Sequence, residues 1–327
     1  ISVISESSIE KGYSNFKTFG ELCDIHTAHP YSVFATKGDP LCSMKPILDL
    51  PFNCRLGEDV AKIPTFIQEF GSLGYMTCSY KSEADFYRAA LLTLFAHGFY
   101  GAMWWDAFDQ GQFDFAPYNW NNIGSNYGFF DMEFKEKPIA EENIKFHKFI
   151  SKIPGKKLPP YQTDAVVIIP RDDGDADIDT LRAAYILAKR ANFDVKFAYA
   201  MDAIPKSALY ILPSLNLNRS ITKRKLSEIL ENVKNGSALY ISIGEALIRE
   251  FPLLSGATAE SRVVGRSNKT MAFDGVEFEL EASVTFAYED VSSEILAYNK
   301  NGEPLMFKNK YGKGSIFVLT APLEKYL

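Results

Sequence analysis

Pro64-Thr-Phe-Ile-Gln-Glu69-Phe-Gly71 carries the clearest structural signal in the sequence, because it joins an apolar strand to a carboxylate and a glycine at the strand's end. At the carboxyl end of a parallel barrel strand, a glutamate points into the mouth of the barrel, and Gly71 allows the chain to turn away beside it. A strand-ending glutamate alone is more often an ordinary surface residue. The stretches on either side therefore decide what Glu69 is.

Polar and aromatic side chains also stand at the ends of the neighbouring predicted strands. Asp24-Ile-His-Thr-Ala-His29-Pro-Tyr31 precedes the central stretch, and Gly101-Ala-Met-Trp104-Trp105-Asp106 follows it. The three strands are expected at residues 22–29, 64–69 and 101–105. Because the carboxyl ends of parallel strands meet at one edge, these side chains are expected to share a site.

Helical patterns separate these strands. One helix is expected to open at a Ser82-Glu-Ala-Asp85 capping box and to end at His97-Gly98, where glycine permits a left-handed exit. A later helix is expected at about 139–151. The alternation of short apolar strands with helices indicates parallel β/α units.

The order of these strand ends resembles strands six, seven and eight of the clan A (β/α)8 retaining glycoside hydrolases, which include families 5 and 42. In that clan a nucleophilic Glu, commonly followed by Phe-Gly, ends strand seven, a His-x-Tyr element ends strand six, and a Trp ends strand eight. The resemblance implies that Glu69 is the nucleophile, that His29 and Tyr31 are its polar supports, and that Trp104, or alternatively Trp105, is the floor of the sugar subsite.

Other residues near these strand ends have less certain roles. Strand alternation does not decide which of the two histidines faces the substrate, and His26 is interpreted as the structural one. A long Gly/Asn/aromatic segment, residues 109–122, follows the last of these strands. Loops over a barrel mouth commonly shape substrate subsites, so Trp120 and Asn121 are candidate substrate contacts, with ordinary loop packing as the alternative.

A retaining glycosidase needs a second carboxylate as general acid, about 5–5.5 Å from the nucleophile. In the clan it follows an Asn at the end of strand four, and this sequence has no Asn-Glu dipeptide. We therefore expect the chain to begin partway along a longer protein, with the acid on an upstream segment. Glu6 is the alternative, although too few residues separate it from residues 22–29 to hold the intervening helices and strand.

A second domain is predicted after a Pro/Gly/Lys-rich linker at residues 153–162, which divides a barrel part at 1–152 from an α/β part at 163–327. Strands expected at 165–169, 195–199, 208–212 and 239–243 alternate with helices at 178–191 and 222–235, a doubly wound pattern. A hairpin at Asn301-Gly302 and a last strand at 315–320 complete it.

This second part resembles the flavodoxin-like class I glutamine amidotransferase fold, which family 42 β-galactosidases use as a trimerisation domain. It contains no Cys and no His, and its turn at Ser242-Ile243-Gly244-Glu245 lacks the Cys nucleophile that amidotransfer requires. The resemblance implies a homo-oligomer, with a trimer favoured. The alternative is a passive spacer that braces the barrel.

Composition excludes several kinds of partner. The net charge is −6 and no basic cluster could neutralise a run of phosphates, so nucleic acid is not expected. Without an apolar stretch of about 18 residues, neither is a membrane span. No cofactor or metal is predicted, because the four cysteines include no Cys-x-x-Cys pair and the acidic run at 172–179 is typical of a helix start. The spacing leaves disulfides open.

The sequence thus favours a retaining β-glycoside hydrolase of the β-galactosidase, β-mannosidase or β-glucosidase type, acting on a carbohydrate substrate. The alternative is a catalytically inactive carbohydrate-binding or scaffolding barrel. The sugar itself cannot be predicted, because loops from all eight strands contribute to its recognition.

Overall fold

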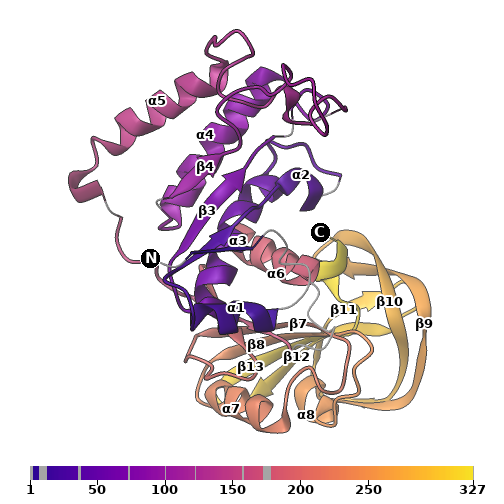
Figure 1. The fold of residues 1–327 in the computed structure, drawn as a ribbon. Helices are drawn as coiled ribbons and strands as arrows, with labels where there is room; N and C mark the ends of the chain where they lie inside the picture. Colours follow the sequence, from indigo (N-terminus) through magenta and orange to yellow (C-terminus); the bar gives the residue numbers. More distant parts are fainter. Residues whose placement is uncertain are drawn as a thin grey trace. The chain divides into compact units, whose positions relative to one another are not determined.

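The computed structural model describes residues 3–6, 13–35, 38–72, 74–99, 101–121, 123–156, 158–171 and 178–326. The chain forms two compact units, Ile1–Tyr161 and Gln162–Leu327 (Figure 1). Their boundary falls within the linker predicted at residues 153–162.

The first unit alternates strands with helices around a four-stranded sheet in the order β1-β2-β3-β4, and every adjacent pair of strands is parallel. The predicted parallel β/α units are therefore confirmed. Its elements are β1 Val3–Glu6, α1 Tyr13–Gly20, β2 Ile25–Ala28, α2 Ser32–Ala35, α3 Met44–Ala61, β3 Thr65–Phe70, α4 Tyr80–Ala96, β4 Ala102–Trp104, the short helix η2 Ile123–Ser125, α5 Pro138–Ile150 and η3 Pro154–Lys156.

The two faces of this sheet differ in burial. On the face towards α4, Phe70 and Trp104 pack against Tyr87 of that helix, with ring centroids 5.9 and 5.4 Å away. Successive residues of a strand point to opposite faces. Met103 points away from the helices and is exposed. The buried face holds the core of the unit, and the opposite face is the more open one.

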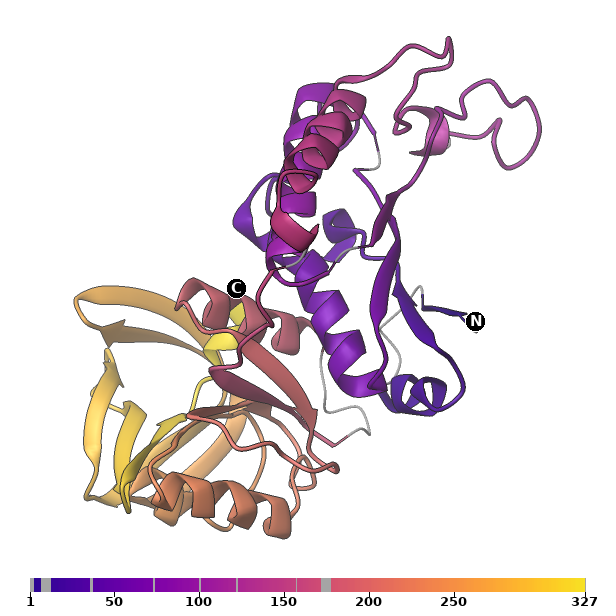
Figure 2. The same cartoon turned by 90° about the vertical axis from the view of Figure 1, so that its left-hand side faces the viewer.

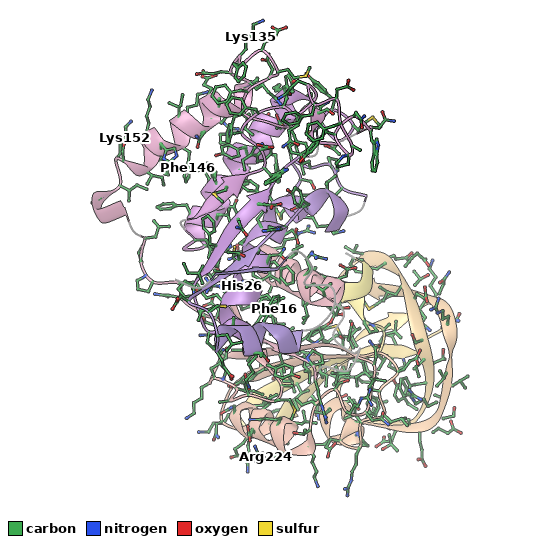
Figure 3. All side chains as sticks on the ribbon, viewed as in Figure 1. Phe16, His26, Lys135, Phe146, Lys152 and Arg224 are labelled. Atoms are coloured by element: carbon green, nitrogen blue, oxygen red, sulfur yellow. The ribbon has the colours of Figure 1, made fainter. Side chains whose placement is uncertain are left out.

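Helix α3 approaches the sheet closely where β2 carries His26. A Cβ added to Gly57 of α3 would lie 2.4 Å from Nδ1 of His26, so only glycine fits there. The His26 ring also packs edge-on against Phe16 of α1, with centroids 4.8 Å apart (Figure 3). Burial lowers the pKa of His26 to about 4. The structural role predicted for His26 agrees with this burial.

The helix boundaries differ from the predicted ones in one instructive place. Helix α4 begins at Tyr80, and its N-cap is Ser79, whose side chain accepts a hydrogen bond from the Ser82 amide. The predicted capping box at Ser82 and Asp85 is therefore wrong, because both residues lie inside the first turns of the helix. An earlier serine supplies the acceptor that the free amides need.

The second unit is built on a nine-stranded sheet in the order β10-β9-β11-β12-β13-β8-β7-β5-β6. Its elements are β5 Ala165–Ile169, α6 Ile178–Arg190, β6 Val195–Tyr199, β7 Leu209–Leu215, α7 Lys223–Lys234, β8 Ala238–Ile243, α8 Phe251–Ser255, β9 Ala257–Phe273, β10 Val276–Val291, β11 Glu294–Asn299, β12 Pro304–Tyr311, β13 Gly314–Leu319 and η4 Leu323–Tyr326.

Five strands of this sheet are parallel, and in chain order they are arranged second-first-third-fourth-fifth. Helix α6 lies on one face of the sheet and α7 on the other (Figure 1). The turn at Asn301-Gly302 joins the antiparallel strands β11 and β12, as predicted. Most of the predicted acidic helix start, residues 172–177, lies outside the described residues.

In the part of the chain that the structure describes, none of the helices has both the length and the apolar character needed to cross a bilayer. All four cysteines are free thiols. Among the described residues, no cluster of three or more His, Cys, Asp or Glu side chains is arranged to hold a metal ion.

Candidate active site

Glu69 lies near the carboxyl end of β3, where the register with β4 shifts between Ile67 and Phe70. The hydroxyl of Tyr31 donates a hydrogen bond to its Oε2 over 3.1 Å, and Nδ1 of His29 lies 3.6 Å from the same oxygen. The Glu69 side chain is 25% exposed. No described residue makes a hydrogen bond to Oε1. One carboxylate oxygen is thus held in place, and the other has no hydrogen bond from the described residues.

The predicted grouping of His29, Tyr31 and Glu69 is therefore found in the structure. Nε2 of His29 lies 3.0 Å from Oε1 of Gln68, so the residue preceding Glu69 orients the imidazole. Burial and the charge of Glu69 raise the pKa of Tyr31, which keeps its hydroxyl protonated as a donor. These contacts suit a carboxylate that works in its ionised form.

Buried polar groups anchor the segment that carries Tyr31. The hydroxyl of Ser32, the next residue, donates to Oδ2 of Asp49 over 3.0 Å. Asp49 is fully buried on α3, and its Oδ1 accepts from Nδ2 of Asn53 over 3.1 Å. Helix α3 thus fixes the chain directly beside Tyr31. This helix was not predicted from the sequence.

Gly71 lies where the chain leaves Glu69. A Cβ at this position would come within 3.1 Å of the Trp105 carbonyl oxygen and 3.4 Å of Cε1 of Tyr31. The prediction explained this glycine by a turn. In the structure Trp105 and Tyr31 both approach this position closely, so an added Cβ would require its neighbours to shift by a few tenths of an ångström.

The two tryptophans of β4 and its exit have different surroundings. Trp104 is only 7% exposed, and its Nε1 donates to the backbone oxygen of Tyr127 over 2.7 Å. It belongs to the core between the sheet and α4. Trp105, one residue on, is 40% exposed and its backbone lies against Gly71. The expectation that Trp104 forms the floor of the sugar subsite is therefore corrected: strand alternation turns Trp104 towards the helices, and Trp105 is the accessible indole.

Tyr127 and Asp106 are site residues that the sequence analysis did not select. The pKa of Tyr127 is raised by burial, a hydrogen bond with Trp105 opposes the rise, and the charges of Asp106 and Glu69 add to it. Asp106 is oriented by its own loop, because it accepts hydrogen bonds from the Ala107 amide and the Gln110 side chain. Tyr127 lies in an irregular segment, so no periodic pattern marks it.

The segment between β4 and α5 is a long loop interrupted only by η2 (Figure 2). Phe113, Phe115 and Tyr118 pack together there, with ring centroids 5.2–5.5 Å apart. Trp120 is 69% exposed and Asn121 is exposed too, so the structure keeps both at the surface of this loop. The hydroxyl of Tyr118 lies close enough to Tyr127 for its charge to affect the pKa of Tyr127.

A separate cavity of about 430 Å³ lies on the helix side of the sheet, between α4, α5 and β4. Its walls are mostly apolar, and none of the site residues named above lines it. The residues lining the cavity are Tyr87, Leu91, Leu94, Phe95, Phe99, Gly101, Ala102, Asn143, Phe146, His147, Ile150 and Gly155.

Glu6, the alternative acid, ends β1, which pairs directly with β2. It therefore stands on the second strand from Glu69 along the same sheet. Its side chain lies outside what the structure describes.

No family model matches the chain, and no curated protein matches its sequence. Solved glycoside hydrolases nevertheless share its fold over most of its length. The exo-β-1,4-mannosidase Op5Man5 from Opitutaceae bacterium strain TAV5 has 20% identity and a TM-score of 0.75, over 93% of this chain and 56% of that chain.

Two β-galactosidases resemble the chain at lower identity. The enzyme from Bacillus circulans sp. alkalophilus has 12% identity and a TM-score of 0.68, over 99% of this chain and 51% of that chain. A catalytic mutant of Gan42B, a GH42 β-galactosidase from G. stearothermophilus, has 12% identity and a TM-score of 0.68, over 95% and 48%. The chain thus spans about half the length of these proteins, and the predicted resemblance is confirmed at the level of the fold.

Proposed function

We propose that this chain carries the nucleophile side of a retaining β-glycosidase, with Glu69 as the nucleophile. The observation that carries the proposal is the asymmetric environment of its carboxylate. Tyr31 and His29 hold Oε2, while Oε1 has no hydrogen bond from the described residues. The fold shared with glycoside hydrolases supports the same reading.

In the proposed reaction, Oε1 of Glu69 forms a bond to the anomeric carbon as the glycosidic C–O bond breaks. The leaving oxygen takes a proton from a general acid, and water, deprotonated by the same group, then displaces the sugar from Glu69. The Tyr31 hydroxyl and the His29 ring keep the carboxylate oriented for attack. Each side chain thus acts by position and charge.

The general acid is assigned to polypeptide that completes the barrel, of which β1 to β4 form strands five to eight. The chain spans about half of the structures that it resembles, which supports this assignment. Sheet edges at β1 and β4 would pair with the remaining strands. Asp106 is an unsuitable acid, because the Ala107 amide and the Gln110 side chain already occupy its two oxygens.

The substrate is a β-galactoside, β-mannoside or β-glucoside. Trp105 supplies the aromatic platform beside Glu69, since aromatic faces stack on the C–H faces of sugars. Trp120 and Asn121 contact the sugar only if the long loop folds over the site. Their present exposure is compatible with that role.

Glu69→Gln and Glu69→Gly in the intact protein test the proposal on a panel of nitrophenyl β-glycosides. Both variants are expected to lose several orders of magnitude in turnover while remaining folded, and azide is expected to restore part of the Glu69→Gly rate as an external nucleophile. Glu133→Gln is the matched control, because Glu133 is an exposed carboxylate paired with Lys135.

Normal turnover by Glu69→Gln would overturn the assignment. Sugar binding without any turnover by the wild-type protein would instead favour the inactive carbohydrate-binding barrel.

The second unit is proposed to be a flavodoxin-like, amidotransferase-like domain that mediates self-association as a trimer. Its parallel strands have the order second-first-third-fourth-fifth, which is the flavodoxin-like order. The domain lacks the Cys and His of an amidotransferase, so a role other than catalysis is needed. Light scattering on the intact protein tests this role, and a strictly monomeric mass at micromolar concentration would remove it.

A further inference from the structure

Lys137 occupies an unusual position for a cation. It is the N-cap residue of α5, and its side chain is only 2% exposed. The positive end of the helix dipole repels a cation there, and water does not reach the ammonium group to compensate. Neither the helix dipole nor hydration stabilises the charge of Lys137, so its neighbouring groups must stabilise it.

The partners of Lys137 come from three separate segments. Its Nζ donates to Oδ1 of Asp109 over 3.0 Å and to the backbone oxygen of Asn126 over 2.9 Å. It also lies 3.9 Å from Oε2 of Glu83 on α4 and 4.3 Å from the centre of the Tyr80 ring. All three charged side chains are almost fully buried.

Lys137 and Asp109 contact the backbone on both sides of a residue near Glu69. Asp109 Oδ1 also accepts from the Gly128 amide over 2.7 Å, so Asn126 and Gly128 are both held by the ion pair. Between them lies Tyr127, whose side chain is within electrostatic range of Glu69. The peptide units on both sides of Tyr127 are therefore fixed by Lys137 and Asp109.

Through Glu83, Lys137 is also connected to the residues that follow Glu69 in the chain. Oε1 of Glu83 accepts from the Ser72 hydroxyl over 2.6 Å, and Ser72 is fully buried. Ser72 is the third residue after Glu69. Lys137 therefore connects the loop that leaves β3 with the loop that leaves β4.

We propose that Lys137 is a positioning residue of the Glu69 site, which fixes Tyr127 and the loop after Glu69 at a set separation. The inference rests on the proposed function for its effect on turnover, but its structural part does not. Burial raises the pKa of Glu83, while Ser72 and Lys137 oppose the rise. Without the ammonium group, two buried carboxylates would face each other unpaired, and the two loops would move apart to admit water.

The test compares Lys137→Met with Lys137→Arg, which keeps the charge, in the intact protein. Lys145→Met is the matched control, because Lys145 also pairs with carboxylates on α5 but is exposed. The first readout is amide exchange at residues 126–128. The second readout is the pKa of Tyr127, which is measured by NMR on a protein with labelled tyrosine rings. The ring signal of Tyr127 is assigned by its absence in Tyr127→Phe.

In Lys137→Met, amide exchange at residues 126–128 is expected to rise about tenfold or more over the Lys145→Met control, as for the loss of one hydrogen bond to a charged group. The pKa of Tyr127 is expected to fall towards its ordinary value, since water replaces its buried surroundings. Turnover is expected to fall about tenfold or more at a temperature well below unfolding, with partial recovery in Lys137→Arg.

Folded Lys137→Met with unchanged amide exchange at residues 126–128 and an unchanged pKa of Tyr127 would overturn the inference. Unchanged turnover in a Lys137→Met protein whose amides at residues 126–128 exchange faster would also overturn it. If Lys137→Met does not fold, Asp109→Ala replaces it, because it removes the Oδ1 that accepts from Lys137 and Gly128, with the same expected results. A wild-type protein without turnover would contradict the proposed function alone, because exchange and titration still decide whether Lys137 positions Tyr127.

Discussion

Replacing Trp104 and Trp105 separately tests the alternation that underlies the whole site. Trp104 is a core side chain and Trp105 an exposed one, although they are adjacent in the chain. Trp104→Ala removes a buried indole and is expected to lower the free energy of unfolding by about 3–5 kcal/mol. It also leaves the Tyr127 carbonyl oxygen without its donor, which costs about 1–3 kcal/mol if water does not reach it.

These losses are large against a total stability of about 5–15 kcal/mol for a domain, so Trp104→Phe is the milder companion. Trp105→Ala removes a partly exposed indole and is expected to cost about 1 kcal/mol or less in stability. Its expected effect is on ligand binding. Losing one aromatic platform is worth about 1 kcal/mol, a decrease in sugar affinity of about fivefold.

Urea unfolding followed by tryptophan fluorescence measures the first effect. The chain has three tryptophans, Trp104, Trp105 and Trp120, and all lie in the first unit, so the signal reports that unit alone. Calorimetric titration with methyl β-mannoside and methyl β-galactoside measures the second. Equal destabilisation by the two substitutions, or weaker sugar binding in a fully stable Trp104→Ala protein, would refute the reasoning.

Three further predictions follow from buried polar groups. Tyr31→Phe removes the donor to Glu69 and is expected to lower kcat/KM by about one to two powers of ten, the value of a hydrogen bond to a charged group, with Tyr298→Phe as an exposed control. The pKa of His26 is lowered from 6.5 to about 4, so the unfolded chain takes up this proton at a higher pH than the folded protein does. The free energy of unfolding is therefore expected to be unaffected by His26 above pH 6.5 and to fall by about 3 kcal/mol as the pH drops to 4. Urea unfolding across this pH range measures the change. Lys269→Met leaves the Glu303 carboxylate, whose side chain is 10% exposed, without its cation and is expected to destabilise the second unit by about 3–5 kcal/mol, measured by far-ultraviolet circular dichroism.

Each of these has a contrary outcome. Tyr31→Phe with wild-type kcat/KM would show that the hydroxyl does not assist Glu69. His26→Asn with the same pH dependence as the wild type would assign that dependence to other groups. Lys269→Met with unchanged unfolding would mean that water already screens Glu303.

The sequence predicted the short apolar strands well because their signals are local, whereas the long strands β9 and β10 were not predicted. The apolar runs at β5 and β6 have the observed bounds Ala165–Ile169 and Val195–Tyr199, and every residue of β5 is buried, as expected for an inner strand of a parallel sheet. Helix α3 escaped detection, because Pro46 and Pro51 interrupt its pattern and buried polar residues such as Asp49 occupy its core face. Tertiary contacts, which no periodicity records, stabilise those residues.

The site was predictable where a residue ends a strand and unpredictable where it lies in a loop. Glu69, His29 and Tyr31 come together because their strands are neighbours in the sheet. Tyr127 reaches the same place through a long irregular loop, and only the buried contacts of that loop determine its position. Trp104 was misassigned because the end of a strand does not reveal which face its last residue takes.

Trapping the covalent intermediate would identify the nucleophile itself. The intact protein would be incubated with 2-deoxy-2-fluoro-β-galactoside and 2-deoxy-2-fluoro-β-mannoside carrying dinitrophenyl leaving groups, then digested and analysed by mass spectrometry. One fluoroglycosyl adduct is expected, on the peptide and at the position of Glu69, and none in Glu69→Gln. An adduct on any other carboxylate, with Glu69 unmodified, would contradict it.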